Sequence, residues 1–383
     1  QKITITFDKI APDALLTFTQ FAPVPKSEFE GIDPLQVQQA PFFQHPIGCG
    51  PFMVEEVNMK NYTILAPFDK YYNGVADFKI QMLPSAGDSD PNVVTRAKSG
   101  NLDYGYTKMI SDVQALEGTP GITITPIDVR YTRLFFLNKF DKQDGSPAPL
   151  ADERVRQAIR YAIDMSTICE TLFQGAAVPA NAMAPDANLK DSSLNDYNYD
   201  PAKAKELLAD AGWDANTTIK VVYYYTDQAT VDLMTAIQAY LADVGIKMEF
   251  ELVEGDLATI LWAAPADQTN GPRAVDWDMC YAANAALSLH EYYDRYRTGS
   301  PTNSHTPEDA ELNRLIDATN ASADVNAQNE AFKDLIKYEN ENMFTMALYY
   351  QPIFLITSDK IGDIQLGTPQ FCINWDIQNW NVQ

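Results

Sequence analysis

A cysteine and a histidine stand ten residues apart in the stretch "WDMCYAANAALSLHEYYDRY", in which Cys280 precedes His290. Such a pair can act as a nucleophile with its base, or can supply two ligands to a metal ion. A catalytic cysteine needs an electropositive environment, which this acidic stretch does not offer. The third interpretation is the wall of a pocket that holds a solute without reacting with it.

The residues that other reaction classes require are missing. The remaining histidines, His45 and His305, are predicted to lie in surface loops, and no GxSxG nucleophile elbow occurs. No phosphate-binding glycine loop is present, because "GCGPF" at Gly48 lacks a helix after it. We therefore expect no enzyme activity, no catalytic residues and no cofactor. The paired carboxylates of a hydrolase stay open, since the chain has 52 acidic residues.

The cysteines do not form a metal-binding pattern. There is no CxxC pair and no Cys/His pair at zinc spacing, so no metal site is expected. An even count permits disulfides without requiring them, and we expect ordinary, mostly buried thiols. The four residues concerned are Cys49, Cys169, Cys280 and Cys372.

Length and charge restrict the class of protein. A chain of 383 residues favours two domains, and 46% hydrophobic residues can build packed interiors. A net charge of −24 disfavours nucleic acid and anionic lipid surfaces as partners. No apolar run is long enough to span a bilayer, so no transmembrane segment is expected.

Residues 1–141 are predicted to form a strand-rich lobe. One helix is expected in "DPNVVTRAKSG", where Pro91 suits the first turn and Gly100 ends it. The polar segment "DKQDGSPAP" then indicates a crossover between lobes. The predicted strands are rich in β-branched or aromatic residues and are "KITITF", "YTILAPF", "DFKIQML", "GITITPI" and "YTRLFFLN".

Residues 142–350 have a different pattern, which predicts an α/β lobe. The helical pattern in "ADERVRQAIRYAIDMSTICETLF" is capped by Asp152 and has one apolar face, so Arg154, Arg156 and Arg160 are expected in solvent. The segment "YDPAKAKELLADAGW" has a cap, a first-turn proline and a glycine stop. Strands then alternate with helices, which is typical of βαβ units and a largely parallel sheet.

Ligands of an open α/β sheet bind beyond the carboxyl ends of its strands. Three regions are expected there, namely residues 225–227, 281–285 and 349–352. Their aromatic rings and amides suit a neutral or mixed ligand that is held by stacking and a few hydrogen bonds.

Several segments resemble the extracellular solute-binding proteins of peptide and nickel ABC importers, family 5. The similarity lies in order, spacing and helix punctuation, and it is strongest in "LFFLNKFDKQDGSPAPLADERVRQAIRYAID" and "YDPAKAKELLADAGW". It implies an α/β, two-lobed periplasmic-binding-protein-like fold of type II, with mixed sheets and flanking helices. Residues 351–383 then return to the N-terminal lobe. Typical members have further residues before "KITITF", so we expect an N-terminally truncated chain with an incomplete first lobe.

The resemblance also suggests ligand-binding residues. In oligopeptide-binding relatives, an arginine and an aspartate pair with the peptide termini, and their positions fall at about Tyr281 and Leu287, which cannot form that salt bridge. The stretch around Cys280 is then interpreted as a pocket wall, with Cys280 inside a strand. Arg133 is the one cation expected to anchor a ligand, with a solvent-exposed arginine as the alternative. Strand alternation directs either Tyr349 or Tyr350 toward the core. The expected ligand-binding residues are Tyr281, Asn284, Tyr225, Arg133, Tyr349 and Tyr350.

The function implied by the resemblance is capture of a solute for an ABC importer. The protein is expected to be an extracytoplasmic monomer, lipid-anchored at the cell surface or periplasmic. It encloses an oligopeptide or similar small solute between two lobes and delivers it to permease subunits. Two alternatives stay open, a secreted carbohydrate- or peptide-active hydrolase and a receptor that senses a peptide without feeding a transporter.

Overall fold

The computed structural model describes residues 2–19, 21–58, 60–85, 90–129, 131–286, 288–362, 364 and 374–383. They form two compact units, one of Gln1–Ala14 and Val129–Pro352 and the other of Leu15–Asp128 and Ile353–Gln383. Helices and mixed sheets build them, so the predicted α/β class is confirmed. The units divide the chain earlier than the expected boundary at residue 141, because the strand Tyr131–Leu137 is central to the sheet of the larger unit.

The larger unit is built on a six-stranded sheet in the order β7-β11-β6-β10-β8-β9. The strand β10 runs parallel to β8, which runs parallel to β9, whereas β6 is antiparallel to both β10 and β11. The sheet is therefore mixed, and the expectation of a largely parallel sheet was wrong because the crossover strand β6 enters its centre. Its strands are β6 (Tyr131–Leu137), β7 (Val178–Pro179), β8 (Thr218–Tyr223), β9 (Lys247–Leu252), β10 (Met279–Ala285) and β11 (Thr345–Tyr350).

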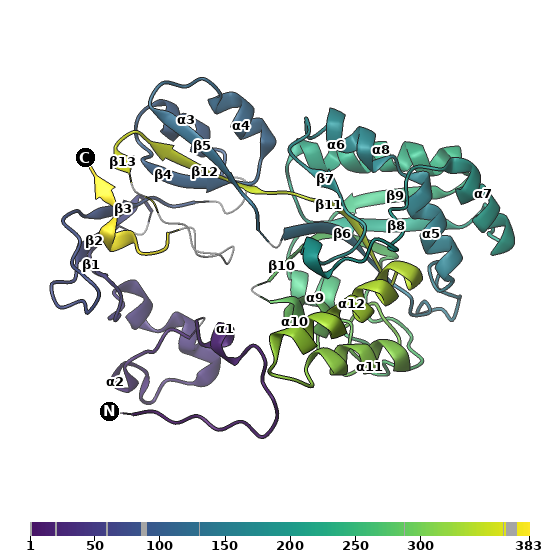
Figure 1. The fold of residues 1–383 in the computed structure, drawn as a ribbon, viewed down its shortest axis with the longest axis horizontal. Helices are drawn as coiled ribbons and strands as arrows, with labels where there is room; N and C mark the ends of the chain where they lie inside the picture. Colours follow the sequence, from purple (N-terminus) through teal and green to yellow (C-terminus); the bar gives the residue numbers. More distant parts are fainter. Residues whose placement is uncertain are drawn as a thin grey trace. The chain divides into compact units, whose positions relative to one another are not determined.

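Helices cover both faces of this sheet, with α6 and α8 on one side and α10, α11 and α12 on the other (Figure 1). Most begin at an aspartate whose carboxylate accepts a backbone N–H of the first turn, as for Asp152, Asp200 and Asp227. The helices are α5 (Glu153–Ala162), α6 (Met165–Thr171), α7 (Pro201–Asp210), α8 (Gln228–Asp243), α9 (Leu257–Trp262), α10 (Leu289–Asp294), α11 (Ala310–Thr319) and α12 (Val325–Asn342), with a 3-10 turn η4 (Ala187–Leu189).

Two arginines of α5 are buried, contrary to expectation. Arg156 and Arg160 retain 6% and 3% of their surface. Arg156 donates to the carbonyls of Leu150, Ala151, Asn342 and Met343, and Arg160 to those of Ile163, Tyr197 and Ala180. The spacing of apolar residues predicted that this face of the helix lies in solvent. In the structure, other segments of the chain cover the face, and their carbonyl groups accept hydrogen bonds from the two arginines.

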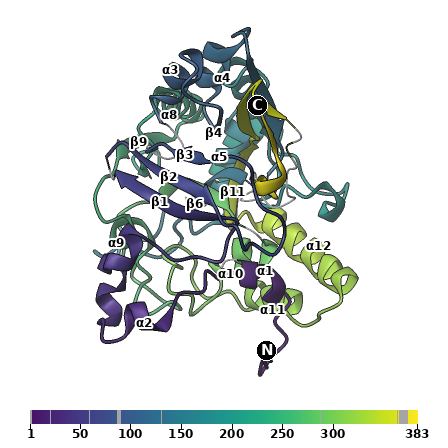
Figure 2. The same ribbon diagram turned by 90° about the vertical axis from the view of Figure 1, so that its left-hand side faces the viewer.

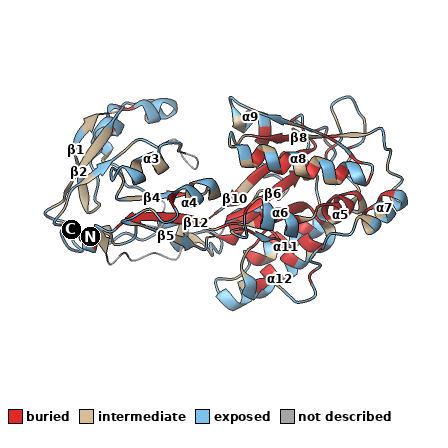
Figure 3. Cartoon of the chain, turned by 90° about the horizontal axis from the view of Figure 1, so that it is seen from above, coloured by how far each residue is buried: buried red, intermediate tan, exposed pale blue. Residues whose placement is uncertain are grey.

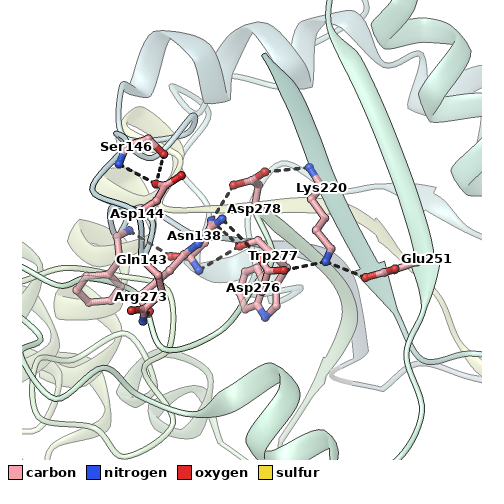
Figure 4. Close-up of polar contacts among 11 residues, drawn as sticks. Asn138, Gln143, Asp144, Ser146, Lys220, Glu251, Arg273, Asp276, Trp277 and Asp278 are labelled. Carbon is pink, nitrogen blue, oxygen red and sulfur yellow. Dashed lines mark hydrogen bonds and ion pairs between the residues drawn. The ribbon is translucent and has the colours of Figure 1, made fainter. Parts of the chain in front are cut away.

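A buried ion pair holds the amino end of β10 (Figure 4). Arg273 Nη1 donates to Asp278 Oδ1 at 2.7 Å and to the carbonyl of Trp277 at 2.9 Å. The other oxygen of Asp278 accepts the backbone N–H of Lys220 in β8 at 2.9 Å. Because Asp278 is fully buried, its pairing fixes where β10 enters the sheet and so positions the residues at the opposite, carboxyl end.

The smaller unit contains two three-stranded sheets, in the orders β1-β2-β3 and β4-β12-β5. The strands β1, β2 and β3 lie side by side in Figure 2, whereas β12 is the most buried strand of this unit (Figure 3). The elements are α1 (Ala14–Thr19), which spans the unit boundary, α2 (Lys26–Phe29), η1 (Pro34–Gln39), η2 (Pro41–Gln44), β1 (Phe52–Asn58), β2 (Tyr62–Pro67), β3 (Ile80–Met82), α3 (Val93–Lys98), β4 (Tyr104–Thr107), α4 (Ile110–Leu116), β5 (Ile122–Ile127), β12 (Ile353–Ser358), β13 (Ile361–Gly362), η5 (Ile377–Asn379) and β14 (Asn381–Val382).

The predicted strand "KITITF" does not form. Residues 2–7 are irregular, and Ile3, Ile5 and Phe7 are 87%, 54% and 49% exposed. Its alternation of apolar and polar residues is a strand pattern, but a strand needs a neighbouring strand to accept its backbone hydrogen bonds.

None of the described helices combines the length and apolar character needed to cross a bilayer.

Candidate functional site

Four of the six expected ligand residues gather at one end of the larger sheet. Arg133 on β6 lies opposite Ala283 of β10 and Tyr349 of β11, and Tyr281 lies opposite Phe135. Tyr225 lies two residues beyond the end of β8. Because strand residues alternate between faces, these positions share one face. They also lie where β8, β10 and β11 reach their carboxyl ends, which is the region where open α/β sheets bind ligands.

A β-bulge contributes to this grouping. The register between β11 and β6 shifts between Ala347 and Tyr349, so that Leu348 is the additional residue. Such bulges change which side chains face a given side of a sheet. The shift brings Tyr349 onto the face of Arg133, and the ring of Tyr349 packs 4.5 Å from that of Phe173.

The guanidinium of Arg133 is enclosed by tyrosine rings. It lies 4.1 Å from the ring centre of Tyr225, 5.0 Å from that of Tyr131 and 5.7 Å from that of Tyr281. The residue is only 6% exposed, so the alternative of a solvent-exposed arginine was wrong. Its Nε and Nη1 atoms are buried without a hydrogen-bond partner among the residues that the structure describes.

The hydroxyls of Tyr281 and Tyr349 are hydrogen-bonded to each other and stay protonated. The hydroxyls of Tyr281 and Tyr349 are 2.6 Å apart, and the Ala283 N–H donates to the hydroxyl of Tyr225 at 3.0 Å. Burial raises the pKa of Tyr281 and the pKa of Tyr349 above the ordinary value for a phenol. Both phenols are therefore neutral at physiological pH and do not neutralise the Arg133 charge. Ring faces stabilise a cation, but less than an anionic partner does.

Asn284 and Tyr350 lie apart from this group, on the opposite face of the sheet. The Asn284 amide lies 3.0 Å from the sulfur of Met183, and its Oδ1 is buried without a described partner. The Tyr350 hydroxyl donates to the carbonyl of Ala182 at 2.6 Å and accepts from Lys190 Nζ at 2.6 Å. Direct contact of these two residues with a ligand remains a prediction.

The same face contains a buried carboxylate that the sequence reasoning missed. Glu339 is 2% exposed and accepts the Met183 N–H and the Tyr293 hydroxyl, each at 2.6 Å. Burial raises the pKa of Glu339 to about 7, and burial lowers the pKa of Lys190 to about 8. The available signal was the position of Glu339 on the helical stripe of Phe332, Leu335 and Ile336, where an acid is unexpected.

The cysteine and histidine of the first motif do not form a reactive pair. Cys280 is fully buried, and burial raises the pKa of its thiol above the ordinary range. His290 is occupied elsewhere, since Nδ1 lies 2.8 Å from a carboxylate oxygen of Asp13 and Nε2 lies 3.1 Å from the carbonyl of Thr319. The interpretation of Cys280 as a strand residue is confirmed. Leu287 and Cys372 lie outside the described residues.

The other histidines and cysteines were predicted with mixed success. His45 is exposed as expected, but His305 is fully buried and the expectation of a surface loop was wrong for it. The rings of Trp277, Tyr296 and Phe136 surround His305, and burial lowers the pKa of this histidine well below its usual value. Cys49 is exposed, whereas Cys169 is buried, and neither forms a disulfide. No group of three or more metal-ligating side chains converges anywhere in the described ranges.

Comparison with known proteins gives a consistent family. The profile of the bacterial extracellular solute-binding proteins, family 5, middle region, matches residues 1–306. A Brucella ovis protein named as an ABC transporter peptide-binding protein is 28% identical over 252 residues, which cover 64% of this chain and 46% of that protein. The glutathione-binding protein GsiB of Pectobacterium atrosepticum is 26% identical over 54% of this chain and 39% of its own length. The chain thus spans about half the length or less of the curated relatives it matches.

The fold agrees with solved structures. The crystal structure of the ABC transporter substrate-binding protein CtaP from Listeria monocytogenes superposes with a TM-score of 0.81 at 19% identity, and the match covers 98% of this chain and 75% of that one. At this identity the likeness establishes the fold alone. It confirms the expected α/β fold of the type II solute-binding proteins.

Proposed function

The chain belongs to the bacterial extracellular solute-binding proteins of family 5, and from that premise we propose that it captures a solute for an ABC importer. In this proposal the solute is an oligopeptide or a similar small molecule, and it passes unchanged to the permease subunits. The names of the relatives, peptide-binding and glutathione-binding proteins, support this class of solute. The protein acts outside the cytoplasm, periplasmic or lipid-anchored, as a monomer.

The observation that carries the proposal is the group of Arg133, Tyr225, Tyr281 and Tyr349 at the carboxyl end of the larger sheet. Ring faces, hydroxyls and one cation provide stacking and hydrogen bonds, which are the usual means of holding a small solute. Burial raises the pKa of Tyr281 and the pKa of Tyr349, so these two phenols are not activated as nucleophiles. Binding without reaction is the chemistry that such a group supports.

Enzymatic hydrolysis has no comparable support. The one Cys/His motif of the sequence is separated into a buried thiol and a histidine whose ring nitrogens both have partners. The named relatives are binding proteins of transporters.

Native mass spectrometry of the full-length protein, purified without denaturation, tests the proposal. We expect a co-purified solute whose mass identifies an oligopeptide or related compound. Tyr225→Ala should weaken its binding, because Tyr225 forms the nearest ring face over Arg133. Tyr199→Ala is the matched control, since Tyr199 is 43% exposed and outside the group.

Two results would contradict the proposal. One is equal affinity of the Tyr225→Ala and Tyr199→Ala variants for the identified solute. The other is repeated release of a cleaved product from that solute, which would show that the protein is a hydrolase.

A further inference from the structure

The guanidinium of Arg133 is stabilised on its faces but not on its edges. Its ring neighbours, Tyr131, Tyr225 and Tyr281, lie 4.1 to 5.7 Å from Cζ. The hydrogens of a guanidinium point outward in its plane, and there Nε and Nη1 have no acceptor among the described residues. No ion pair of the described residues includes Arg133.

Other buried arginines of the same unit show what the fold does when an arginine is purely structural. Arg156 donates to four backbone carbonyls, and Arg273 pairs with the carboxylate of Asp278. Buried cations are normally satisfied in one of these ways, because an unpaired buried charge is costly. Arg133, with 94% of its surface covered, has neither carbonyl nor carboxylate at Nε and Nη1.

The location of Arg133 favours an external partner. It lies near the amino end of the central strand β6, beside the carboxyl ends of β8, β10 and β11. A chain with a net charge of −24 repels anions in general. A buried cation without a counterion is therefore a specific means of attracting one anionic group to one place.

A carboxylate matches the unfilled groups in shape and charge. It is planar, and its two oxygens can accept two N–H bonds of one guanidinium at once. The hydroxyl pair of Tyr281 and Tyr349 lies beside the cation, and one of these hydroxyls can donate a further hydrogen bond to an anion.

We propose that the solute carries a carboxylate group, which binds the N–H edge of Arg133 beside the rings of Tyr225 and Tyr281. This inference rests on the proposed function, because it assigns a chemical class to the solute of the same site. The carboxylate belongs either to the free C-terminus of a peptide or to a small organic acid.

Binding to matched pools of solutes tests the inference on the full-length protein. The first pool contains tripeptides with a free C-terminus, the second contains the same tripeptides as C-terminal amides, and the third contains di- and tricarboxylic acids. We expect retention of the first or the third pool, and the one retained identifies the source of the carboxylate. If tripeptides are retained, the amides should bind at least about tenfold more weakly.

Variants locate the effect at Arg133. Arg133→Gln should lose about tenfold to 100-fold in affinity for the retained acid, and should lose any preference for acid over amide. Arg133→Lys should keep part of that preference. Arg295→Gln is the matched control, since Arg295 also lies over an aromatic ring, Phe136 at 5.4 Å, and has an unpartnered Nε, but its ring belongs to the opposite face. The melting temperature of Arg133→Gln should not fall, because the variant removes an unneutralised buried charge.

The outcomes separate the two proposals. The carboxylate proposal is refuted if the wild type binds tripeptide acids and amides with equal affinity. It is also refuted if Arg133→Gln keeps the wild-type affinity for the acid. Neither result contradicts the proposed capture of a solute. A wild-type protein that retains no pool and carries no co-purified solute overturns both proposals.

Discussion

Arginine side chains of the larger unit illustrate how burial depends on partners at the scale of single residues. Arg156 reaches the carbonyls of Asn342 and Met343 at the end of α12, and it thereby satisfies groups that a helix C-terminus leaves free. Arg154 on the same helix has a side chain that is 43% exposed and pairs with Asp152. The two arginines should therefore contribute very differently to stability.

We expect Arg156→Met to lower the free energy of unfolding by about 3 kcal/mol, because it leaves several buried carbonyls without a donor. Arg154→Met, the matched control, should cost less than about 1 kcal/mol, as is typical of an exposed ion pair. Urea unfolding of both variants measures the difference. Equal losses would show that the carbonyl contacts of Arg156 do not stabilise the fold.

Glu339 predicts a dependence of stability on pH. Its pKa rises from 4.5 to about 7 on folding, so between these values the folded state holds a proton that the unfolded state has released. Stability from this group is complete below pH 4.5 and is lost as the pH rises through 7. The total is roughly 3 kcal/mol.

The variant Glu339→Gln should remove this part of the pH dependence, because an amide cannot ionise. Chemical unfolding at a series of pH values measures it, with Glu341→Gln at an exposed position of α12 as control. A Glu339→Gln protein whose stability decreases with rising pH as steeply as that of the wild type would contradict the assignment.

His305 has the opposite effect on stability. Its pKa is lowered in the folded state, so the folded protein loses stability as the pH falls below 6.5.

Candidate residues of the site could be predicted from the sequence, but the groups that each of them contacts could not. Tyr281 was predicted from its place near the carboxyl end of a strand, Arg133 was named as the candidate cation alongside the family resemblance, and the structure brings the two together. The face of Tyr349 was undecidable, because the bulge that sets it depends on pairing with β6. Lys190 and Glu339 were missed since a polar residue's burial depends on distant groups, such as the Met183 N–H, that local patterns do not reveal.

At the scale of elements, helix starts in the larger unit depend on aspartate caps. Asp309 does more than a cap requires. Its Oδ1 accepts the N–H groups of Glu311 and Leu312, and its Oδ2 accepts the hydroxyl of Tyr338 from α12 at 2.7 Å. Asp309 thus connects α11 to α12 while it begins α11.

We expect Asp309→Ala to cost about 2 kcal/mol, the sum of a cap and a charged hydrogen bond. Asp324→Ala, which removes the cap of α12 alone, should cost about 1 kcal/mol. Thermal unfolding of Asp309→Ala, Tyr338→Phe and the double variant measures the coupling between the two helices. Strictly additive losses would mean that the Asp309–Tyr338 bond contributes nothing.

Elements with strong local signals were predicted well, and those that depend on distant pairing were not. The cap and first-turn proline predicted in "YDPAKAKELLADAGW" agree with α7, which begins at Pro201 after the N-cap Asp200. The apolar segment "FTMALYYQPIFLIT" contains two strands, β11 and β12, which separate at Gln351 and Pro352. A proline lacks the backbone N–H that a continuous strand needs, and this signal was present in the sequence.

At the scale of the whole molecule, charge is the dominant feature. A net charge of −24 is spread over 383 residues, and self-repulsion of this kind destabilises a compact state. Most ion pairs of the described residues are exposed, such as Lys79–Glu55 and Arg314–Glu311, and they contribute little.

We therefore expect the melting temperature to rise by several degrees as NaCl increases from about 0.01 M to about 0.15 M, where the Debye length falls from about 30 Å to about 8 Å. Screening weakens the net repulsion more than it weakens the few attractive pairs. Calorimetry at constant pH measures the shift. A falling melting temperature would show that attractive pairs outweigh the excess of acids.

The bulge at Leu348 has an evolutionary consequence. Tyr349 and Tyr350 are neighbours in the chain, yet each phenol approaches a cation, Arg133 on one face and Lys190 on the other. Deletion of Leu348 would close the bulge and leave Tyr349 opposite Arg133 and Tyr350 opposite Thr132, so both rings would keep their faces. Strand β11 can therefore shorten by one residue at this point without a change in the chemistry of either face.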